Sequence, residues 1–315
     1  MTSLHEAALT AVDQCLSLAP DESCAIVTDS ERLAIGEALY EAARNRTDDA
    51  VLLRYEPGIE HGAEPPDPVA GGMIESDTFL APTTKSISHT RARSRATEAG
   101  ARGATLPGIT EEVFVTGLAA DYERIAAECA RVAQAVVDAE VVRVTSPAGT
   151  DITFEIGDRS WRRDTGIVRE PGSFSNLPAG EVFVSPQSAT GTYVIDGTIR
   201  PHGLLASGQT VTVTVEDGYA VAIDDDAVAE SFERASETVG RDAYNVAELG
   251  IGTNTAVTDL VGSVLLDEKA AGTVHIALGD DASIGGDTEA PIHADGVLRE
   301  PSVYVDGVAL DLPSA

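Results

Sequence analysis

The chain contains little of several residue types, and each shortage excludes a class of protein. Its 315 residues include three cysteines, Cys15, Cys24 and Cys129, which are too few and too scattered for a disulfide framework or a cysteine zinc site. No apolar run reaches the roughly 18–20 residues of a membrane-spanning helix. The first residues also lack the basic segment and apolar block of a signal peptide. We therefore expect a cytoplasmic protein without a membrane partner.

Lysine is the scarcest charged residue. Lys85 and Lys269 are the only lysines among 21 basic residues, against 52 acidic residues and a formal net charge of −31. The acids are spread along the whole chain, a pattern that resembles halophilic proteins, in which salt screens the repulsion between like charges. Such a surface repels the phosphate backbone, so we expect no nucleic-acid partner.

Strands and helices alternate in the first part of the chain. Apolar runs bounded by polar turns predict strands, and helical apolar spacing predicts helices. The predicted strands are 24–29, 51–55, 78–81 and 104–107, and the predicted helices are 4–18, 31–44 and 119–139. This alternation is typical of a parallel α/β sheet. We therefore predict an α/β N-terminal domain over residues 1–140.

The signals become mainly β after residue 140. A hairpin pattern covers residues 141–156, and it is followed by strand candidates at 192–195, 210–216 and 219–223 and by a helix at 226–239. We predict a β-rich (α+β) domain over residues 141–315. The fold class of the whole chain is then α/β, with the candidate functional residues concentrated in the second domain.

A hydroxyl-rich and basic loop follows the predicted strand 78–81. It contains Lys85 and His89 and leads into several arginines. Open α/β sheets place ligands at the carboxyl ends of their strands, so Lys85 and His89 are candidate substrate-binding residues. The alternative is an arginine-rich helix start that balances nearby acids.

Two histidines and an aspartate form the first candidate metal site. His275 lies in a short apolar run that predicts a buried strand. His293 and Asp295 are two residues apart, so their side chains share one face of an extended segment. Imidazole and carboxylate together suit Zn, Mn or Fe. A buried histidine paired structurally with an aspartate is the alternative.

Two glutamates strengthen the metal interpretation. Glu181 follows a Pro-Ala-Gly turn and enters an apolar run, and Glu248 lies among apolar and glycine residues. A buried carboxylate is costly unless it is paired or bound to a cation. Glycine next to the acid permits close approach of the backbone. Both residues are candidate metal ligands, and either is a candidate general base.

Four motifs in series carry a resemblance to a known family. NLPAGEVF (176–183), AELGIGTN (247–254), TVHIALG (273–279) and HAD (293–295) look like the aminopeptidase T family of metallopeptidases. The resemblance implies an α/β first domain, a second domain with one or two divalent ions such as Zn, Co or Mn, and a homodimer. It also implies that five residues are metal ligands: Glu181, Glu248, His275, His293 and Asp295.

One departure from that family opens an alternative. The family's peptidases have a tyrosine where this chain has Ala282, which removes a ligand for a second ion. The same fold is used by 2,5-dihydroxypyridine dioxygenase, which resembles these peptidases and uses one Fe(II). Two histidines and one carboxylate, here His275, His293 and Asp295, are also the ligands of a facial triad for non-haem iron.

These observations predict an enzyme that acts on a small peptide or another small molecule. The leading hypothesis is a metallo-aminopeptidase, a hydrolase in which Glu181 or Glu248 assists a metal-activated water. The alternatives are an Fe(II) dioxygenase of the same fold and an inactive metal-binding homologue.

Overall fold

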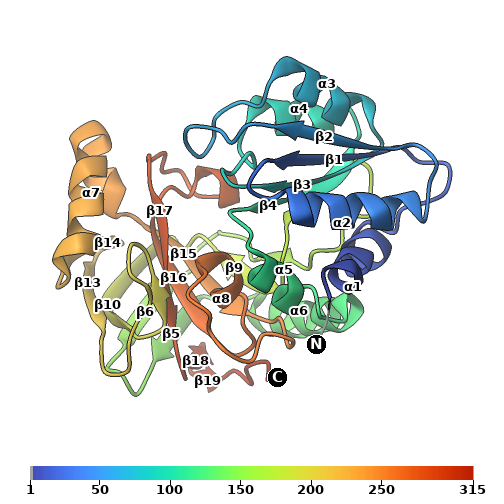
Figure 1. The fold of residues 1–315 in the computed structure, drawn as a ribbon. Helices are drawn as coiled ribbons and strands as arrows, with labels where there is room; N and C mark the ends of the chain where they lie inside the picture. Colours follow the sequence, from blue (N-terminus) through green and yellow to red (C-terminus); the bar gives the residue numbers. More distant parts are fainter. Residues whose placement is uncertain (1–2, 315) are drawn as a thin grey trace. The chain divides into compact units, whose positions relative to one another are not determined.

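The structure of the protein, a computed structural model, describes residues 3–314 (Figure 1). It divides the chain into two compact units. The first contains the residues up to Ala126 together with Asp164–Ala179, and the second contains Ala127–Arg163 and the residues from Gly180 onward. The sequence predicted one boundary at residue 140. The division differs because a short segment returns to the first unit, and its three-residue strand is too short to show a periodic pattern.

The first unit is built on a parallel sheet in the order β2-β1-β3-β4-β8. Its elements are α1 (Leu4–Leu9), the π-helical η1 (Thr10–Leu16), β1 (Cys24–Asp29), α2 (Leu33–Arg44), β2 (Ala50–Tyr55), α3 (Asp67–Glu75), β3 (Thr78–Thr83), α4 (Arg91–Glu98), β4 (Arg102–Pro107), α5 (Glu111–Gly117) and β8 (Phe174–Asn176). Figure 1 shows α3 and α4 on one face of this sheet and α2 on the other. All six residues of β1 are buried, as expected for a strand that is covered on both faces. The predicted parallel α/β arrangement is confirmed.

The second unit is mainly antiparallel. The order in its larger sheet is β14-β13-β10-β6-β5-β18-β19 and in its smaller sheet β17-β16-β15-β9-β7, and β11 and β12 form a separate pair. The strands are β5 (Val141–Thr145), β6 (Asp151–Glu155), β7 (Arg162–Asp164), β9 (Glu181–Val184), β10 (Ser188–Ile195), β11 (Thr198–Ile199), β12 (Gly203–Leu204), β13 (Val211–Glu216), β14 (Tyr219–Ile223), β15 (Val246–Gly252), β16 (Val274–Gly279), β17 (His293–Leu298), β18 (Ser302–Val305) and β19 (Val308–Ala309). The predicted hairpin over 141–156 is the antiparallel pair β5–β6.

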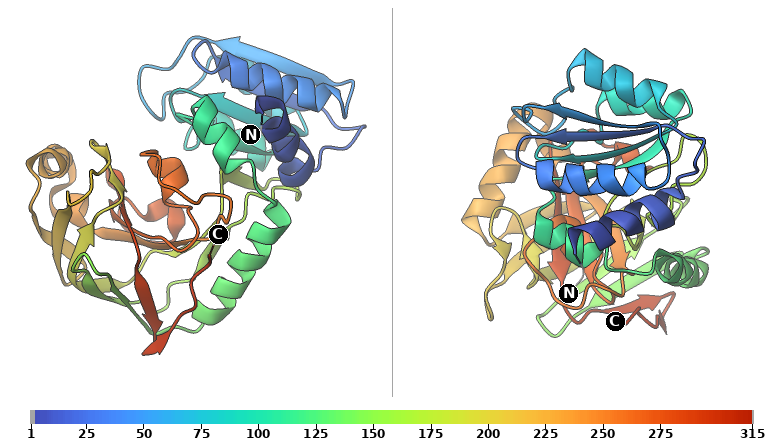
Figure 2. Two further views of the ribbon diagram at one scale, coloured as in Figure 1. Left: turned by 60° about the horizontal axis from the view of Figure 1, so that its bottom comes forward. Right: turned by 45° about the vertical axis from the view of Figure 1, so that its right-hand side comes forward.

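Helices are few in the second unit. The long helix α6 (Tyr122–Val136) runs into it from the first unit, and it is followed along the chain by α7 (Asp226–Val239), the 3₁₀ turn η2 (Gly240–Tyr244), α8 (Val264–Asp267) and the 3₁₀ turn η3 (Ala282–Ile284) (Figure 2). The boundaries of α7 coincide with those predicted from the sequence. Among the described residues, no helix is both long and apolar enough to cross a membrane.

Candidate metal centre

One face of the smaller sheet of the second unit carries all five residues that the sequence singled out as ligands. In β15, Glu248, Gly250 and Gly252 alternate with apolar residues and therefore share a face. Cross-strand pairing extends this face to neighbouring strands, since Glu248 is opposite Ala277 of β16, and Ala277 is opposite Asp295 of β17. The remaining polar residues follow the same register: His275 is opposite Gly250, Glu181 opposite Gly252 and His293 opposite Gly279.

Small residues on this face leave room for the polar ones. A Cβ atom on Gly250 would lie 2.0 Å from Nε2 of His275, so the imidazole ring occupies the space above a missing side chain. Ala277 lies between Glu248 and Asp295 and offers only a methyl group, and neighbouring strands are separated by about 4.8 Å. The two carboxylates therefore extend over Ala277 from either side. The alternation of polar and small residues in β15 and β16 creates a polar site on an otherwise apolar sheet, and Glu181, Glu248 and His275 are buried in it.

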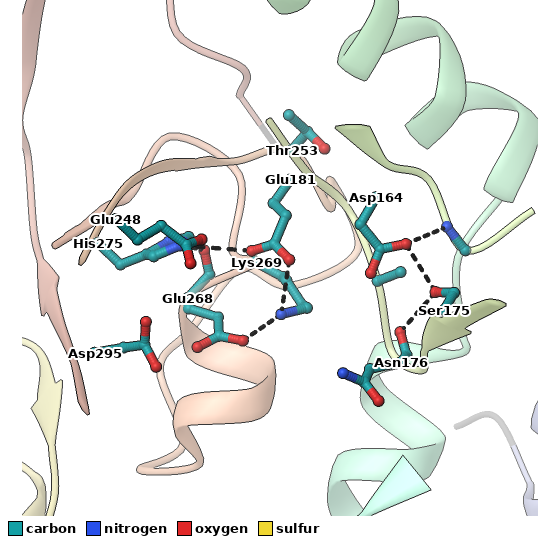
Figure 3. Close-up of polar contacts among 12 residues, drawn as sticks. Asp164, Ser175, Asn176, Glu181, Glu248, Thr253, Glu268, Lys269, His275 and Asp295 are labelled. Atoms are coloured by element: carbon teal, nitrogen blue, oxygen red, sulfur yellow. Dashed lines mark hydrogen bonds and ion pairs between the residues drawn. The ribbon is translucent and has the colours of Figure 1, made fainter. Parts of the chain in front are cut away.

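The polar side chains form two groups that share Glu248. Glu181, Glu248 and His275 form the first group, and Glu248, His293 and Asp295 form the second; within each, one ligand atom per residue lies within 4.8 Å of the others. Figure 3 shows Glu181, Glu248, His275 and Asp295 around this site. The sequence placed His275, His293 and Asp295 around a single ion, whereas the structure divides them between the two groups.

Short distances connect the two groups through Glu248. Nε2 of His275 lies 3.1 Å from Oε1 of Glu248 and 3.5 Å from Oε2 of Glu181. Nε2 of His293 lies 3.5 Å from Oε2 of Glu248 and 3.3 Å from Oδ1 of Asp295. Glu248 therefore presents one oxygen to each histidine.

Both imidazoles are held by backbone carbonyls through their other ring nitrogen. Nδ1 of His275 is 3.0 Å from the carbonyl oxygen of Glu268, and Nδ1 of His293 is 2.7 Å from that of Asp280. A carbonyl accepts but does not donate, so in each ring Nδ1 carries the proton. Nε2 is then directed at the carboxylates, as in protein metal sites where the second ring nitrogen is bonded to a backbone carbonyl.

The electrostatics of the metal-free site favour protonated histidines. Burial lowers the pKa of His275, but the hydrogen bond with Glu248 and the surrounding carboxylates outweigh it and raise that pKa to about 9. The pKa of His293 is also raised well above its ordinary value, because Asp295 and Glu248 outweigh the effect of burial. In Asp295 the charges of the histidines outweigh burial and lower the pKa. These carboxylates need a cation nearby, which the imidazolium groups supply when metal is absent.

Two charged residues of this site were missed by the sequence reasoning. Glu268 and Lys269 follow α8, and the ammonium of Lys269 contacts carboxylates of both Glu268 and Glu181 (Figure 3), the latter at 3.2 Å. The Lys269 side chain is 3% exposed. One signal was present in the sequence: Lys269 is one of two lysines in the chain and lies six residues before His275.

Lys85 and His89 belong to the first unit. They lie in the loop between β3 and α4, where the hydroxyl of Thr83 donates a hydrogen bond to the carbonyl of Lys85. His89 is exposed and Lys85 half-buried. Their role in substrate binding stays a prediction.

The donor set fits a divalent ion of the first transition row. Imidazole nitrogen and carboxylate oxygen suit Fe(II), Zn and Mn, and the Nδ1 contacts leave both Nε2 atoms available for coordination. The second group, Glu248, His293 and Asp295, has one histidine and two carboxylates, with His275 adjoining through Glu248. Ala282, at the place of the peptidases' tyrosine, is an exposed residue at the start of η3 and offers no ligand.

The class of fold follows from two solved structures. 2,5-Dihydroxypyridine dioxygenase from Pseudomonas putida KT2440 superposes with a TM-score of 0.79 at 20% identity, covering 98% of this chain and 95% of the other. Wild-type AmpT from Thermus thermophilus superposes with a TM-score of 0.67 at 19% identity, covering 98% and 96%. Both similarities concern the fold alone, and they confirm the aminopeptidase T-like architecture.

The sequence comparisons then identify the family. The NicX family model, described as 2,5-dihydroxypyridine 5,6-dioxygenase, matches residues 67–310. This chain belongs to that family. A curated 2,5-dihydroxypyridine 5,6-dioxygenase of Pseudomonas putida KT2440 is 26% identical over 186 residues, which are 55% of this chain and 53% of the relative. The matched part thus spans about half the length of that relative.

The prediction of a metallo-aminopeptidase, a hydrolase, is therefore wrong. The family model describes dioxygenases, the curated relative is a dioxygenase, and dioxygenases are oxidoreductases. The likeness to AmpT is one of fold. The error has a physical reason. The motifs that suggested a peptidase are the carboxylates, histidines and glycines that build the polar sheet face, and a site of these ligand types suits both chemistries. Ala282, in place of the peptidases' tyrosine, was the residue that argued against a peptidase.

Proposed function

We propose that the protein is an Fe(II)-dependent dioxygenase that opens the ring of a dihydroxylated aromatic compound of the dihydroxypyridine type. Membership of the dioxygenase family carries the proposal, since the matched region contains all five candidate ligands and both lysines. The donor set of the site supports it, because mixed imidazole and carboxylate ligands suit Fe(II).

In this proposal Glu248, His293 and Asp295 hold the ion, with His275 adjoining as a further ligand. When bound, Fe(II) supplies the one-electron chemistry that allows a ring to react with molecular oxygen. The protein residues fix the ion's position: the backbone carbonyls of Glu268 and Asp280 orient the two imidazoles, and the apolar side of the sheet keeps the strands in register. Before the ion enters, the protons on the two Nε2 atoms must leave.

Glu181 is proposed as the proton acceptor for a substrate hydroxyl. Burial raises the pKa of Glu181 to about 8 against the opposing charge of Lys269. A carboxylate with a pKa near the working pH is suited to take up and return a proton. Glu248 presents its two oxygens to the two histidines and so is better placed as a ligand than as a base.

Oxygen consumption tests the proposed reaction. Protein loaded anaerobically with Fe(II) should consume one O₂ per 2,5-dihydroxypyridine and abolish the aromatic absorbance, and both atoms of ¹⁸O₂ should appear in the product. Glu181→Gln should retain iron and lose turnover. An iron-loaded protein that consumes no oxygen with any dihydroxylated pyridine or benzene would remove the proposal. The homodimer is also kept as a proposal, which light scattering at high salt tests.

A further inference from the structure

The Lys269 ammonium is the most unusual charge in the second unit. A chain that uses arginine for nearly all its basic residues places one of its two lysines in the interior, with 3% of the side chain exposed. Burying an ammonium is costly unless it is paired. Here it is paired twice, with Glu181 and with Glu268, whose side chains are 10% and 13% exposed.

The backbone is arranged to bring Lys269 over Glu181. Gly252 is opposite Glu181 in the sheet. A Cβ atom on Gly252 would lie 2.8 Å from the carbonyl carbon of Lys269 and 2.1 Å from the carbonyl oxygen of Ala270. The main chain after α8 can therefore pass directly above β15 only because this position is glycine. The amide of Asn254 donates to the Lys269 carbonyl at 2.8 Å and holds the chain there.

The position of the ammonium distinguishes the two ligand groups. In the first group Glu181 already has a cation at 3.2 Å, and Glu248 and His275 complete that group. In the second group Glu248, His293 and Asp295 have no lysine or arginine among the ion pairs of the described residues. A divalent ion entering the first group would lie beside an ammonium that is already paired with one of its ligands. The second group has no such ion pair, and the ammonium acts on Asp295 only at longer range.

We propose that Lys269 acts as a built-in cation that takes the place of a second metal ion and limits the site to one ion per chain. Glu181 is thereby held by the ammonium and is not a metal ligand. The charges are consistent with this assignment. Even with all four carboxylates ionised, those of Glu181, Glu248, Glu268 and Asp295, one ammonium and one divalent ion leave a single negative charge, and a second divalent ion would make the centre positive. This inference rests on the proposed function for the identity of the ion but concerns the number of ions.

Counting Co(II) ions tests the inference without relying on turnover. Chelator-treated protein is titrated anaerobically with Co(II), and bound metal is counted by elemental analysis after gel filtration. Wild type should bind one Co(II) per chain, and Lys269→Met, which removes the charge but keeps most of the length, should bind two. Lys269→Arg should still bind one. Lys85→Met, at the chain's other lysine, is the matched control for the metal count and should also bind one.

Two results would overturn the inference: wild type with two ions, or folded Lys269→Met with one. If Lys269→Met does not fold, Glu181→Gln decides the question. Its Co(II) affinity should stay within about twofold of wild type if Glu181 faces the ammonium, but loss of a ligand should weaken binding ten-fold or more. One bound Co(II) in wild type and two in Lys269→Met, together with no oxygen consumption by the iron-loaded protein, would support the role of Lys269 while overturning the proposed reaction.

Discussion

Gly250 is the residue on which the geometry of the metal centre depends most directly. Its missing side chain makes room for the His275 ring, because a Cβ there would lie 2.0 Å from Nε2. Gly250→Ala should therefore displace the ring, lower the free energy of unfolding by about 1–3 kcal/mol, as overpacking typically does, and weaken metal binding. Gly71→Ala in α3 is the control, since a Cβ there meets nothing within 4 Å. It should stabilise by about 0.5–1 kcal/mol. Unchanged Co(II) affinity in Gly250→Ala would contradict this account of the glycine.

A buried arginine in the first unit supports a pH prediction. The Arg102 guanidinium bonds to both carboxylate oxygens of Glu22, with Nη2 at 2.8 Å from Oε2, and this lowers the pKa of Glu22. A depressed folded-state pKa stabilises the fold above the unfolded value of about 4.3, and this stability is lost as the pH falls through the folded-state pKa.

Glu22→Gln should therefore cost about 1.5 kcal/mol at pH 7, a value typical of a hydrogen bond between charged groups. The difference from wild type should close as the pH falls below about 4, because Glu22 then becomes neutral in both states. Denaturant unfolding at several pH values measures it. Glu37→Gln, on the exposed side of α2, should change stability by less than about 0.5 kcal/mol. A deficit of the same size at pH 3 would show that the pair acts by packing and not by charge.

At the scale of elements, β17 contributes His293 and Asp295 to the second ligand group. Metal that binds only the folded state should stabilise wild type by about 2.7 kcal/mol when its free concentration is 100 times Kd. His293→Ala should abolish most of this stabilisation, because it removes a ligand from the second group. His202→Ala is the matched control: that imidazole also pairs with a carboxylate, Asp225 at 2.9 Å, but outside the site. Thermal unfolding with and without Co(II) distinguishes them, and an equal metal-induced shift in all three proteins would exclude His293 as a ligand.

The elements also show what could be predicted from the sequence. β16 was predicted from the apolar run around His275, and the two-residue spacing of His293 and Asp295 placed both side chains on one face of an extended segment, now β17. β15 was not predicted as a strand, although Glu248 and its glycines were recognised as site residues. The return of β8 to the first sheet could not be predicted, because a three-residue strand has no period and its partner β4 is distant in the sequence. Lys269 was missed for a related reason. Its partner Glu181 is distant in the sequence, so only the register of β9 with β15 brings the two together.

At the scale of the whole molecule, the net charge of −31 governs stability at low salt. The basic residues can pair with only part of the acidic residues. The remaining carboxylates repel one another more strongly as the screening length increases. The melting temperature should fall when salt is lowered from above 1 M to below about 0.1 M, where the Debye length exceeds roughly 10 Å. NaCl and KCl should act alike, because the effect is one of screening. A melting temperature that stays flat or rises on desalting would remove the halophilic interpretation.

Because lysine is scarce, chemical modification of the lysine side chains can report how often the second unit opens. An amine-acylating reagent has two side-chain targets, of which Lys85 is half-buried and Lys269 enclosed. Lys85 should react directly, whereas Lys269 should react only in molecules whose second unit has transiently opened. Co(II) at 100 times Kd should slow the modification of Lys269 about 100-fold, as measured by peptide mass spectrometry, and leave that of Lys85 unchanged. Equal rates at both lysines would contradict the enclosed position. An ordinary amine reagent would then measure how often the interior around the metal centre is exposed to water.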